Sequence, residues 1–173
     1  MVRGFFIGVA VLIFAALLGG YALLQSGLVP ANADATPGGL ELWAAGTSLN
    51  ATLRNQAPRG PNPVALTDDH LIEGIRLYGE HCALCHGTAG GEASASPVAR
   101  GLYPSPPQFG AEGVEDDSEG VSFWKIKHGI RLTGMPSWGH SLSDEQIWTI
   151  ALFLKHMDAL PPRAQQAWRQ VRN

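Results

Sequence analysis

Cys82 and Cys85 are the two cysteines of this 173-residue chain, and His86 directly follows the second one. A Cys-x-x-Cys-His run is typical of a site where a haem is covalently attached. Each thiol can add to one vinyl group of the haem, and the next residue then lies where its imidazole nitrogen can bind the iron. The motif therefore predicts one covalent haem c, bound through Cys82, Cys85 and His86.

Two other kinds of site also use closely spaced cysteines. A thioredoxin-like redox pair is expected within a βαβ unit, and the sequence around Cys82 shows no such pattern. A structural zinc ion usually takes four protein ligands, and the chain has no second cysteine pair. Haem attachment is the interpretation that the motif favours.

Met135 is the candidate for the second iron ligand. Haem iron has two axial positions, and a methionine thioether suits a histidine-ligated haem that carries electrons. The other two methionines lie at the N-terminus and near the end of a predicted helix, whereas Met135 stands between Gly134 and Pro136 in a turn-like setting. A lone methionine often only fills a core. The alternative ligands are His128 and His140.

Two helices are expected to position the haem motif. Thr67 can cap a helix that leads into Cys82, because apolar residues recur at helical spacing between them. Ser143 begins a capping-box pattern, and the strongly apolar helix behind it is predicted to run to about Met157. Gly74 allows the two helices to approach closely.

For the contact between these helices we predict that Trp148 and Leu152 pack over Gly74 and Tyr78. Thr149 and His156 define the polar strip of the second helix.

A third helix is predicted from about Val121 to His128. The segment 87–120 between the helices is rich in Gly, Pro and Ser and ends in an acidic cluster formed by Glu112, Glu115, Asp116, Asp117 and Glu119.

The N-terminal segment predicts a membrane anchor. Residues 5–24 are twenty residues without a charge, about the length that crosses a bilayer as a helix. Arg3 precedes them and the next positive charge is Arg54, which places Arg3 in the cytoplasm and the rest of the chain outside. A cleaved signal is the alternative, because alanines at 31, 33 and 35 offer cleavage sites. Both interpretations bring the cysteines to the oxidising side.

Residues 25–66 contain five prolines and are predicted to form an extended periplasmic linker. Within it, Thr47 can cap a short helix that ends at Arg54. Leu40, Leu42 and Trp43 form an apolar group, expected to lie on the haem domain or on another subunit. Residues 161–173 form a C-terminal tail that could dock on the domain, a partner or lipid.

The charges exclude one class of partner. Twelve Lys and Arg against fifteen Asp and Glu leave no basic excess, so nucleic acid is not an expected partner. Lys125, Lys127 and Arg131 flank the Met135 loop. They could form a docking patch for redox partners or be an ordinary solvated charge distribution.

The order of these motifs resembles a class I cytochrome c. It comprises Gly74-x-x-x-Tyr78, the haem motif, Pro107-Gln-Phe109, Thr133-Gly134-Met135-Pro136 and a helix with Trp148. Over about residues 66–157 the chain is similar to single-haem proteins grouped with the haem subunit of cbb3-type oxidases. The resemblance implies a small all-α fold around one haem, and a proline carbonyl, that of Pro107, that steadies the free N–H of His86. Further candidate haem-binding residues are Tyr103, Phe109 and Trp138.

The sequence thus predicts four segments: an anchor over 1–24, the linker over 25–66, a haem domain over 67–160 and the tail over 161–173. The expected function is single-electron transfer between redox partners, without enzyme activity, by a bacterial inner-membrane protein whose haem domain is periplasmic. One alternative is a fixed haem subunit of a larger membrane oxidoreductase. Another is a haem peroxidase or gas-binding protein, which would need an open iron position.

Overall fold

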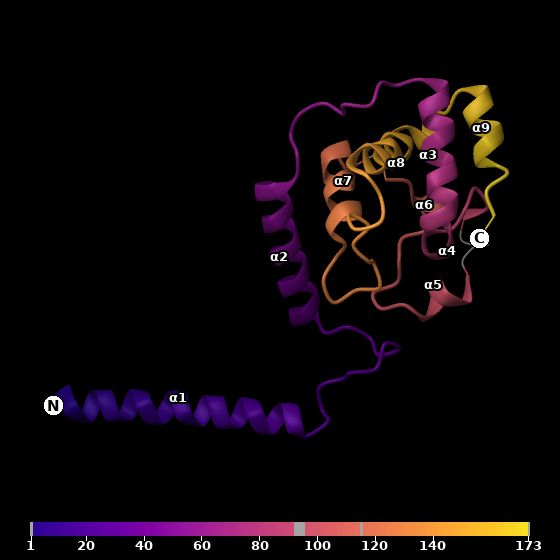
Figure 1. Cartoon of the computed structure of the whole chain (residues 1–173). Coiled ribbons are helices and arrows are strands. Elements are labelled where there is room, and N and C mark those ends of the chain that lie inside the picture. The colour runs from indigo at the N-terminus through magenta and orange to yellow at the C-terminus, as the bar shows by residue number, and fades with distance from the viewer. Residues whose placement is uncertain (1, 92–95, 115, 173) are drawn as a thin grey trace. The chain divides into compact units, whose positions relative to one another are not determined.

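The structure is a computed structural model that describes residues 2–91, 96–114 and 116–172, so Glu115 of the acidic cluster lies outside it. Within these ranges all regular elements are helices, which confirms the predicted all-α fold (Figure 1). The chain forms two compact units, Met1–Thr36 and Pro37–Asn173.

The first unit is built on helix α1, Val2–Gln25, which has 24 residues. Its most apolar stretch of 18 residues has a mean hydropathy of 2.4, so the helix is long and apolar enough to cross a membrane. At 1.5 Å per residue such a helix is about 36 Å long, slightly more than the hydrocarbon core of a bilayer. The predicted N-terminal apolar helix is therefore present, with one more turn than residues 5–24.

In the second unit, α3 (Asp68–His81) and α8 (Asp144–His156) begin at the predicted caps. The Thr67 hydroxyl accepts a hydrogen bond from the His70 backbone N–H at 3.2 Å. Ser143 and Gln146 form the complete capping box, with side-chain bonds in both directions of 3.2 and 2.9 Å. These bonds satisfy backbone donors that a helix start would otherwise leave unpaired.

Helices α3 and α8 cross at Gly74. A Cβ on this glycine would lie 2.5 Å from the Thr149 carbonyl oxygen and 2.8 Å from the Phe153 Cβ. The prediction that Gly74 allows close approach is confirmed, but the prediction of Trp148 and Leu152 over it was wrong. The residues that meet Gly74 are Thr149 and Phe153.

Trp148 instead stacks on Phe123 of helix α7 (Glu119–His128), with ring centroids 4.3 Å apart. Thr149, predicted to lie on a polar strip, is buried. It can be buried because its hydroxyl donates to the Glu145 carbonyl at 2.8 Å, one turn earlier in the same helix.

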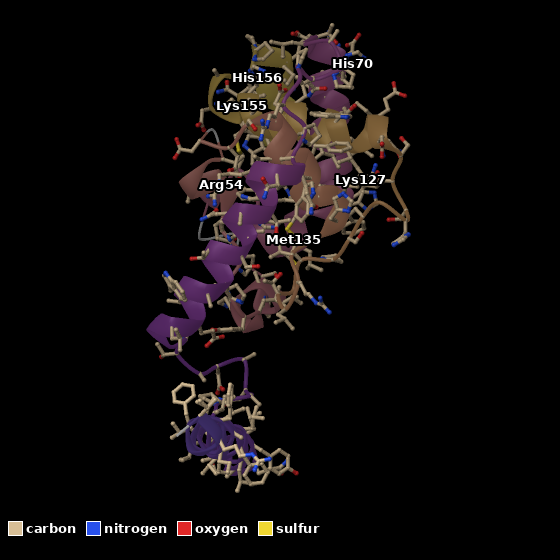
Figure 2. All side chains as sticks on the ribbon, turned by 90° about the vertical axis from the view of Figure 1, so that its left-hand side faces the viewer. Arg54, His70, Lys127, Met135, Lys155 and His156 are labelled. Atoms are coloured by element: carbon tan, nitrogen blue, oxygen red, sulfur yellow. The ribbon has the colours of Figure 1, made fainter. Side chains whose placement is uncertain are left out.

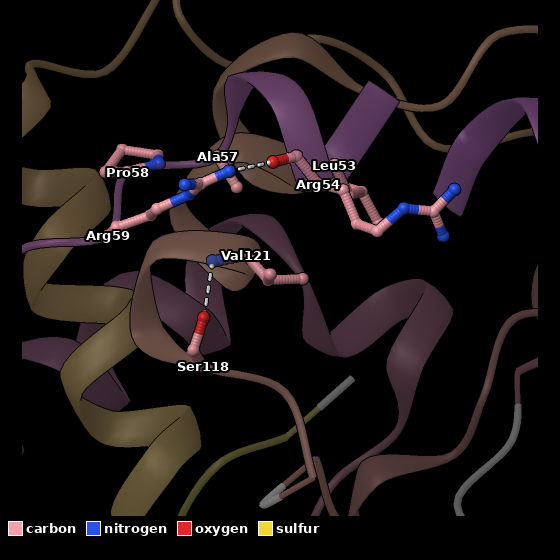
Figure 3. A pocket seen from close by; sticks show the side chains of 7 residues that line it. All are labelled: Leu53, Arg54, Ala57, Pro58, Arg59, Ser118 and Val121. Carbon is pink, nitrogen blue, oxygen red and sulfur yellow. Dashed lines mark hydrogen bonds between the residues drawn. The ribbon is translucent and has the colours of Figure 1, made fainter. Parts of the chain in front are cut away.

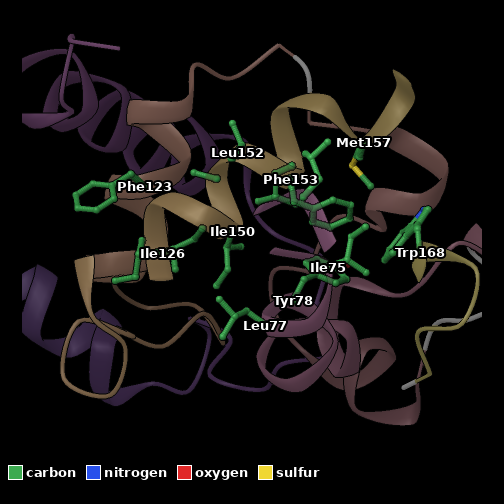
Figure 4. Close-up of a cluster of buried hydrophobic side chains, with 14 of the residues drawn as sticks. Ile75, Leu77, Tyr78, Phe123, Ile126, Ile150, Leu152, Phe153, Met157 and Trp168 are labelled. Carbon is green, nitrogen blue, oxygen red and sulfur yellow. The ribbon is translucent and has the colours of Figure 1, made fainter. Parts of the chain in front are cut away.

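The core of the second unit lies between α3, α7, α8 and α9 (Pro162–Trp168) (Figure 4). Tyr78, Phe153 and Trp168 form an aromatic triangle at its centre, with ring centroids 5.2 to 5.4 Å apart. Because Trp168 and Ala164 are buried against α3, the C-terminal tail docks on the domain itself.

Helix α2, Gly39–Gln56, is longer than the short helix predicted to begin at Thr47. Its last turn packs on the domain through the buried side chain of Leu53, beside a pocket of about 440 Å³ between α2 and the start of α7 (Figure 3). In its first turn, the apolar side chains of Leu40, Leu42 and Trp43 are 76, 55 and 67% exposed. This apolar group therefore does not lie on the haem domain.

The chain between α2 and α3 is also attached to the domain. The Asn62 side-chain amide donates to Glu119 Oε1 at 2.9 Å and to the Trp148 carbonyl at 3.1 Å. The remaining helical segments, α4 (Ala83–His86), α5 (Pro97–Gly101), α6 (Phe109–Glu112) and η2 (Met157–Ala159), are short. Three of them, α4, α5 and α6, belong to the long connection between α3 and α7.

Candidate functional site

The haem motif forms a short helix at the end of α3. The Cys82 backbone N–H donates to Tyr78 in α3, and the Cys82 carbonyl accepts from Cys85 and His86 at 3.0 and 2.9 Å. Cys82, Cys85 and His86 thereby line one cavity together. The local backbone bonds alone bring the two sulfur atoms and the imidazole to the same place.

The His86 ring is held from two directions. Its Nδ1 lies 3.0 Å from the Pro107 carbonyl oxygen, and its face stacks on Phe109 with centroids 4.3 Å apart and planes 6° from parallel. A carbonyl oxygen can only accept, so Nδ1 carries the proton and the lone pair is on Nε2. Burial lowers the pKa of His86, although the bond to Pro107 opposes this, and the ring is therefore neutral near pH 7. A neutral imidazole with a free Nε2 is the form that binds iron.

The loop that carries Met135, the residue labelled in Figure 2, is bonded to α7 by its backbone. The Met135 carbonyl accepts from the Ile130 N–H at 3.2 Å, and the Met135 N–H donates to Thr133 Oγ1 at 3.1 Å. After it, the Trp138 N–H donates to the Ile126 carbonyl at 3.1 Å. These bonds hold Met135 at the cavity that His86 also lines.

The cavity has a volume of about 660 Å³ and a mostly apolar lining. This volume is within the range of cofactor pockets. The structure brings seven of the eight predicted site residues to it: Cys82, Cys85, His86, Pro107, Phe109, Met135 and Trp138. It does not bring Tyr103, whose hydroxyl instead donates to Glu41 Oε1 of α2 at 2.7 Å.

The chemistry of the cysteines fits covalent attachment better than the alternatives. Burial, with a smaller contribution from Cys85, raises the pKa of Cys82 to about 12, so it is a thiol and not the thiolate of a redox pair. Both cysteines are free of disulfides. Among the described residues no group of three or more His, Cys, Asp or Glu side chains is placed to hold a metal ion. Two thiols beside a neutral imidazole in an apolar cavity fit a haem.

The alternative iron ligands lie elsewhere. His128 contacts the Trp124 ring at 4.9 Å, and neither His128 nor His140 lines the cavity. His81, which was not predicted as a site residue, lines it and its ring lies 5.0 Å from the Trp138 ring. Its place directly before Cys82, at the end of the same helix, was the available signal.

Sequence reasoning also missed an ion pair at the cavity. Lys125 Nζ lies 2.6 Å from Asp117 Oδ2, and both residues line the cavity. Lys127 pairs with Asp144 at 2.7 Å. Two of the three basic residues predicted to flank the Met135 loop are thus paired with acids. Asp117 of the acidic cluster therefore lies beside Lys125.

Comparison with known proteins shows which proteins part of this chain is similar to. The family model of cytochrome c oxidase, cbb3-type, subunit III matches residues 70–154. The quinohemoprotein alcohol dehydrogenase ADH IIB of Pseudomonas putida is 28% identical over 96 residues, which are 56% of this chain and 12% of that enzyme.

Among solved structures, the reducing HAO-like protein complex Kustc0457/Kustc0458 of Kuenenia stuttgartiensis aligns with a TM-score of 0.44 and 22% identity. The alignment covers 60% of this chain and 52% of that one. The chain thus spans a small part of the first relative and about half of the second.

Proposed function

Because the chain is a class I c-type cytochrome-like protein, we propose that it carries one haem c and transfers single electrons between redox partners. Cys82 and Cys85 would form the thioether bonds to the haem, and His86 and Met135 would be the two iron ligands. The observation that carries the proposal is that Met135 and a His86 ring with a free Nε2 line the same cavity.

The bound haem supplies the one-electron chemistry, and the chain supplies its environment. Pro107 and Phe109 hold the His86 ring, and backbone bonds from Trp138 and Gly139 to α7 hold the loop that carries Met135. A methionine ligand and an apolar cavity both raise the reduction potential, which suits a carrier on the oxidising side of a membrane. With His86 and Met135 both as ligands, the iron would have no open position for a substrate, so the proposed role is electron transfer and not the making or breaking of substrate bonds.

We further propose that α1 anchors the protein in the bacterial inner membrane with the haem domain in the periplasm. The length and hydropathy of α1 support the anchor, and Arg3 before it supports the orientation. The functional segments are then 1–24 as anchor, 25–66 as linker, 67–160 as haem domain and 161–173 as tail.

A fixed subunit of a larger membrane oxidoreductase is the second candidate. The exposed first turn of α2 favours it, because Leu40, Leu42 and Trp43 form an uncovered apolar group of the kind found at subunit interfaces. The matched family is consistent with this candidate, since that family takes its name from an oxidase subunit. An open-site peroxidase or gas-binding protein is less well supported, because Met135 lines the cavity.

The test is purification of the full chain in detergent from a host that attaches c-type haem. We expect the mass of the denatured chain to exceed the mass of the polypeptide by one haem, with one iron per chain. Cys82→Ala and Cys85→Ala should each leave a single thioether bond and shift the haem spectrum, whereas Tyr103→Phe should leave it unchanged. A full-length protein without covalent haem would refute the proposal. Stoichiometric co-purifying chains would favour the subunit over the free carrier.

A further inference from the structure

Gln108 lies between the two residues that touch the His86 ring. Pro107 on one side accepts the hydrogen bond from Nδ1, and Phe109 on the other side stacks on the ring face. We propose that Gln108 is a positioning residue that sets the orientation of the His86 imidazole and thereby tunes the iron. The inference rests on the proposed function, in which His86 binds that iron.

The Gln108 side chain is 8% exposed and ties the segment to the haem motif. Its Nε2 donates to the Cys85 carbonyl and to the Pro106 carbonyl, both at 3.0 Å. One amide nitrogen thus links the residue directly before His86 with the residue directly before Pro107. The hydrogen bond from His86 to Pro107 is a second link between the same two segments, so the Gln108 and His86 bonds together join the haem motif to residues 106–108.

The partners of the Gln108 side-chain amide determine which way its nitrogen and oxygen point. Both are carbonyl oxygens, which only accept, so the nitrogen must face them. The Gln108 Oε1 is buried and has no hydrogen-bond partner among the described residues. A glutamate has nearly the same shape, but when ionised it would turn an acceptor toward both carbonyls and could form neither bond.

A second contact holds the other end of the segment. A Cβ on Gly110 would lie 2.1 Å from the Thr88 carbonyl oxygen, so the backbone of 108–110 lies directly on the backbone that follows the haem motif. Gln108 and Gly110 therefore fix the segment that carries Pro107 and Phe109 at two points. The Pro107 carbonyl has little freedom to turn away from His86 while both contacts persist.

Loss of the Gln108 bonds should act on the iron through His86. A hydrogen bond from the non-ligating nitrogen fixes the ring and raises the basicity of the ligand. A weaker bond to Pro107 makes the imidazole a poorer electron donor to ferric iron. Gln108 would then affect the reduction potential without touching the haem.

The test compares full-length Gln108→Met with the wild type in detergent. Methionine keeps the length of the side chain and removes both donors. We expect covalent haem and Met135 ligation to be retained, the reduction potential to rise, and the His86 Nδ1 proton of the reduced protein to exchange about tenfold faster by NMR, because two hydrogen bonds are lost. Gln108→Glu should accelerate this exchange as well, and it provides the measurement if the methionine variant does not fold.

Gln146→Met is the matched control. It removes the side-chain bond to the Ser143 N–H at 2.9 Å and so weakens a helix cap outside the cavity. It should lower stability but leave the potential and the exchange rate unchanged. Wild-type exchange and potential in both Gln108 variants would overturn the inference and leave the proposed function intact. A wild-type protein without covalent haem would refute the proposed function itself.

Discussion

The carbonyl oxygen of Thr149 in α8 lies where a side chain on Gly74 in α3 would begin, 2.5 Å from the position of its Cβ. The contact places the helix that leads into Cys82 directly against α8. Any side chain at Gly74 must push the two helices apart, because the obstacle is backbone and cannot rotate away.

Gly74→Ala should therefore lower the free energy of unfolding by about 2 kcal/mol, as overpacking typically does. Denaturant unfolding of the haem domain is the measurement. The control is Gly46→Ala in α2, where a Cβ would meet nothing within 4 Å. That variant should be neutral or slightly stabilising, because alanine favours helix over glycine. Equal effects at both positions would show that the close helix contact does not exist.

Tyr78→Phe tests the polar bond within the core. The Tyr78 hydroxyl, whose pKa is raised by burial, donates to the Gly87 carbonyl at 2.8 Å, directly after the haem motif. Its removal leaves a buried carbonyl without its donor and should cost about 1–3 kcal/mol in thermal or denaturant unfolding. Tyr103→Phe removes the exposed bond to Glu41 and should cost less than about 0.5 kcal/mol. A reversed order would contradict the assignment of Tyr78 to the core.

Trp168→Ala tests the docking of the C-terminal helix. Trp168 is 7% exposed between Tyr78 and Phe153, and truncation of such a side chain typically costs about 3–5 kcal/mol. Trp43→Ala in the exposed first turn of α2 is the control and should leave the unfolding free energy almost unchanged. If Trp168→Ala were as mild as Trp43→Ala, α9 would not be part of the core.

Local patterns of the chain predicted the parts of the fold that depend on neighbours in sequence. The caps at Thr67 and Ser143 and the end of α7 at His128 are where hydrogen-bond chemistry within a few residues places them. The haem motif and the Met135 loop were found for the same reason. The residue types in these two short segments, namely two cysteines with a histidine and a methionine between glycine and proline, already indicate haem attachment and iron ligation.

Contacts between distant segments were predicted less well. Helical spacing alone does not determine which face of α8 meets Gly74, so Thr149 appeared polar although its hydroxyl bonds within its own helix. The pairing of Lys125 with Asp117 and the contact of Tyr103 with Glu41 depend on how loops fold back. Helix α2 begins at Gly39, eight residues before Thr47, and it has no side-chain cap there, so the sequence carried no capping signal for its start.

The identity of the second iron ligand tests the account most directly. The measurement is carbon monoxide binding to the reduced, full-length protein, together with its reduction potential. We expect the wild type not to bind carbon monoxide readily, Met135→Ala to bind it, and Met135→His to lower the potential markedly. Met157→Ala, at a buried methionine outside the cavity, should lower stability and leave both properties unchanged. Ready carbon monoxide binding by the wild type, or an unchanged potential in Met135→His, would contradict the His86 and Met135 site.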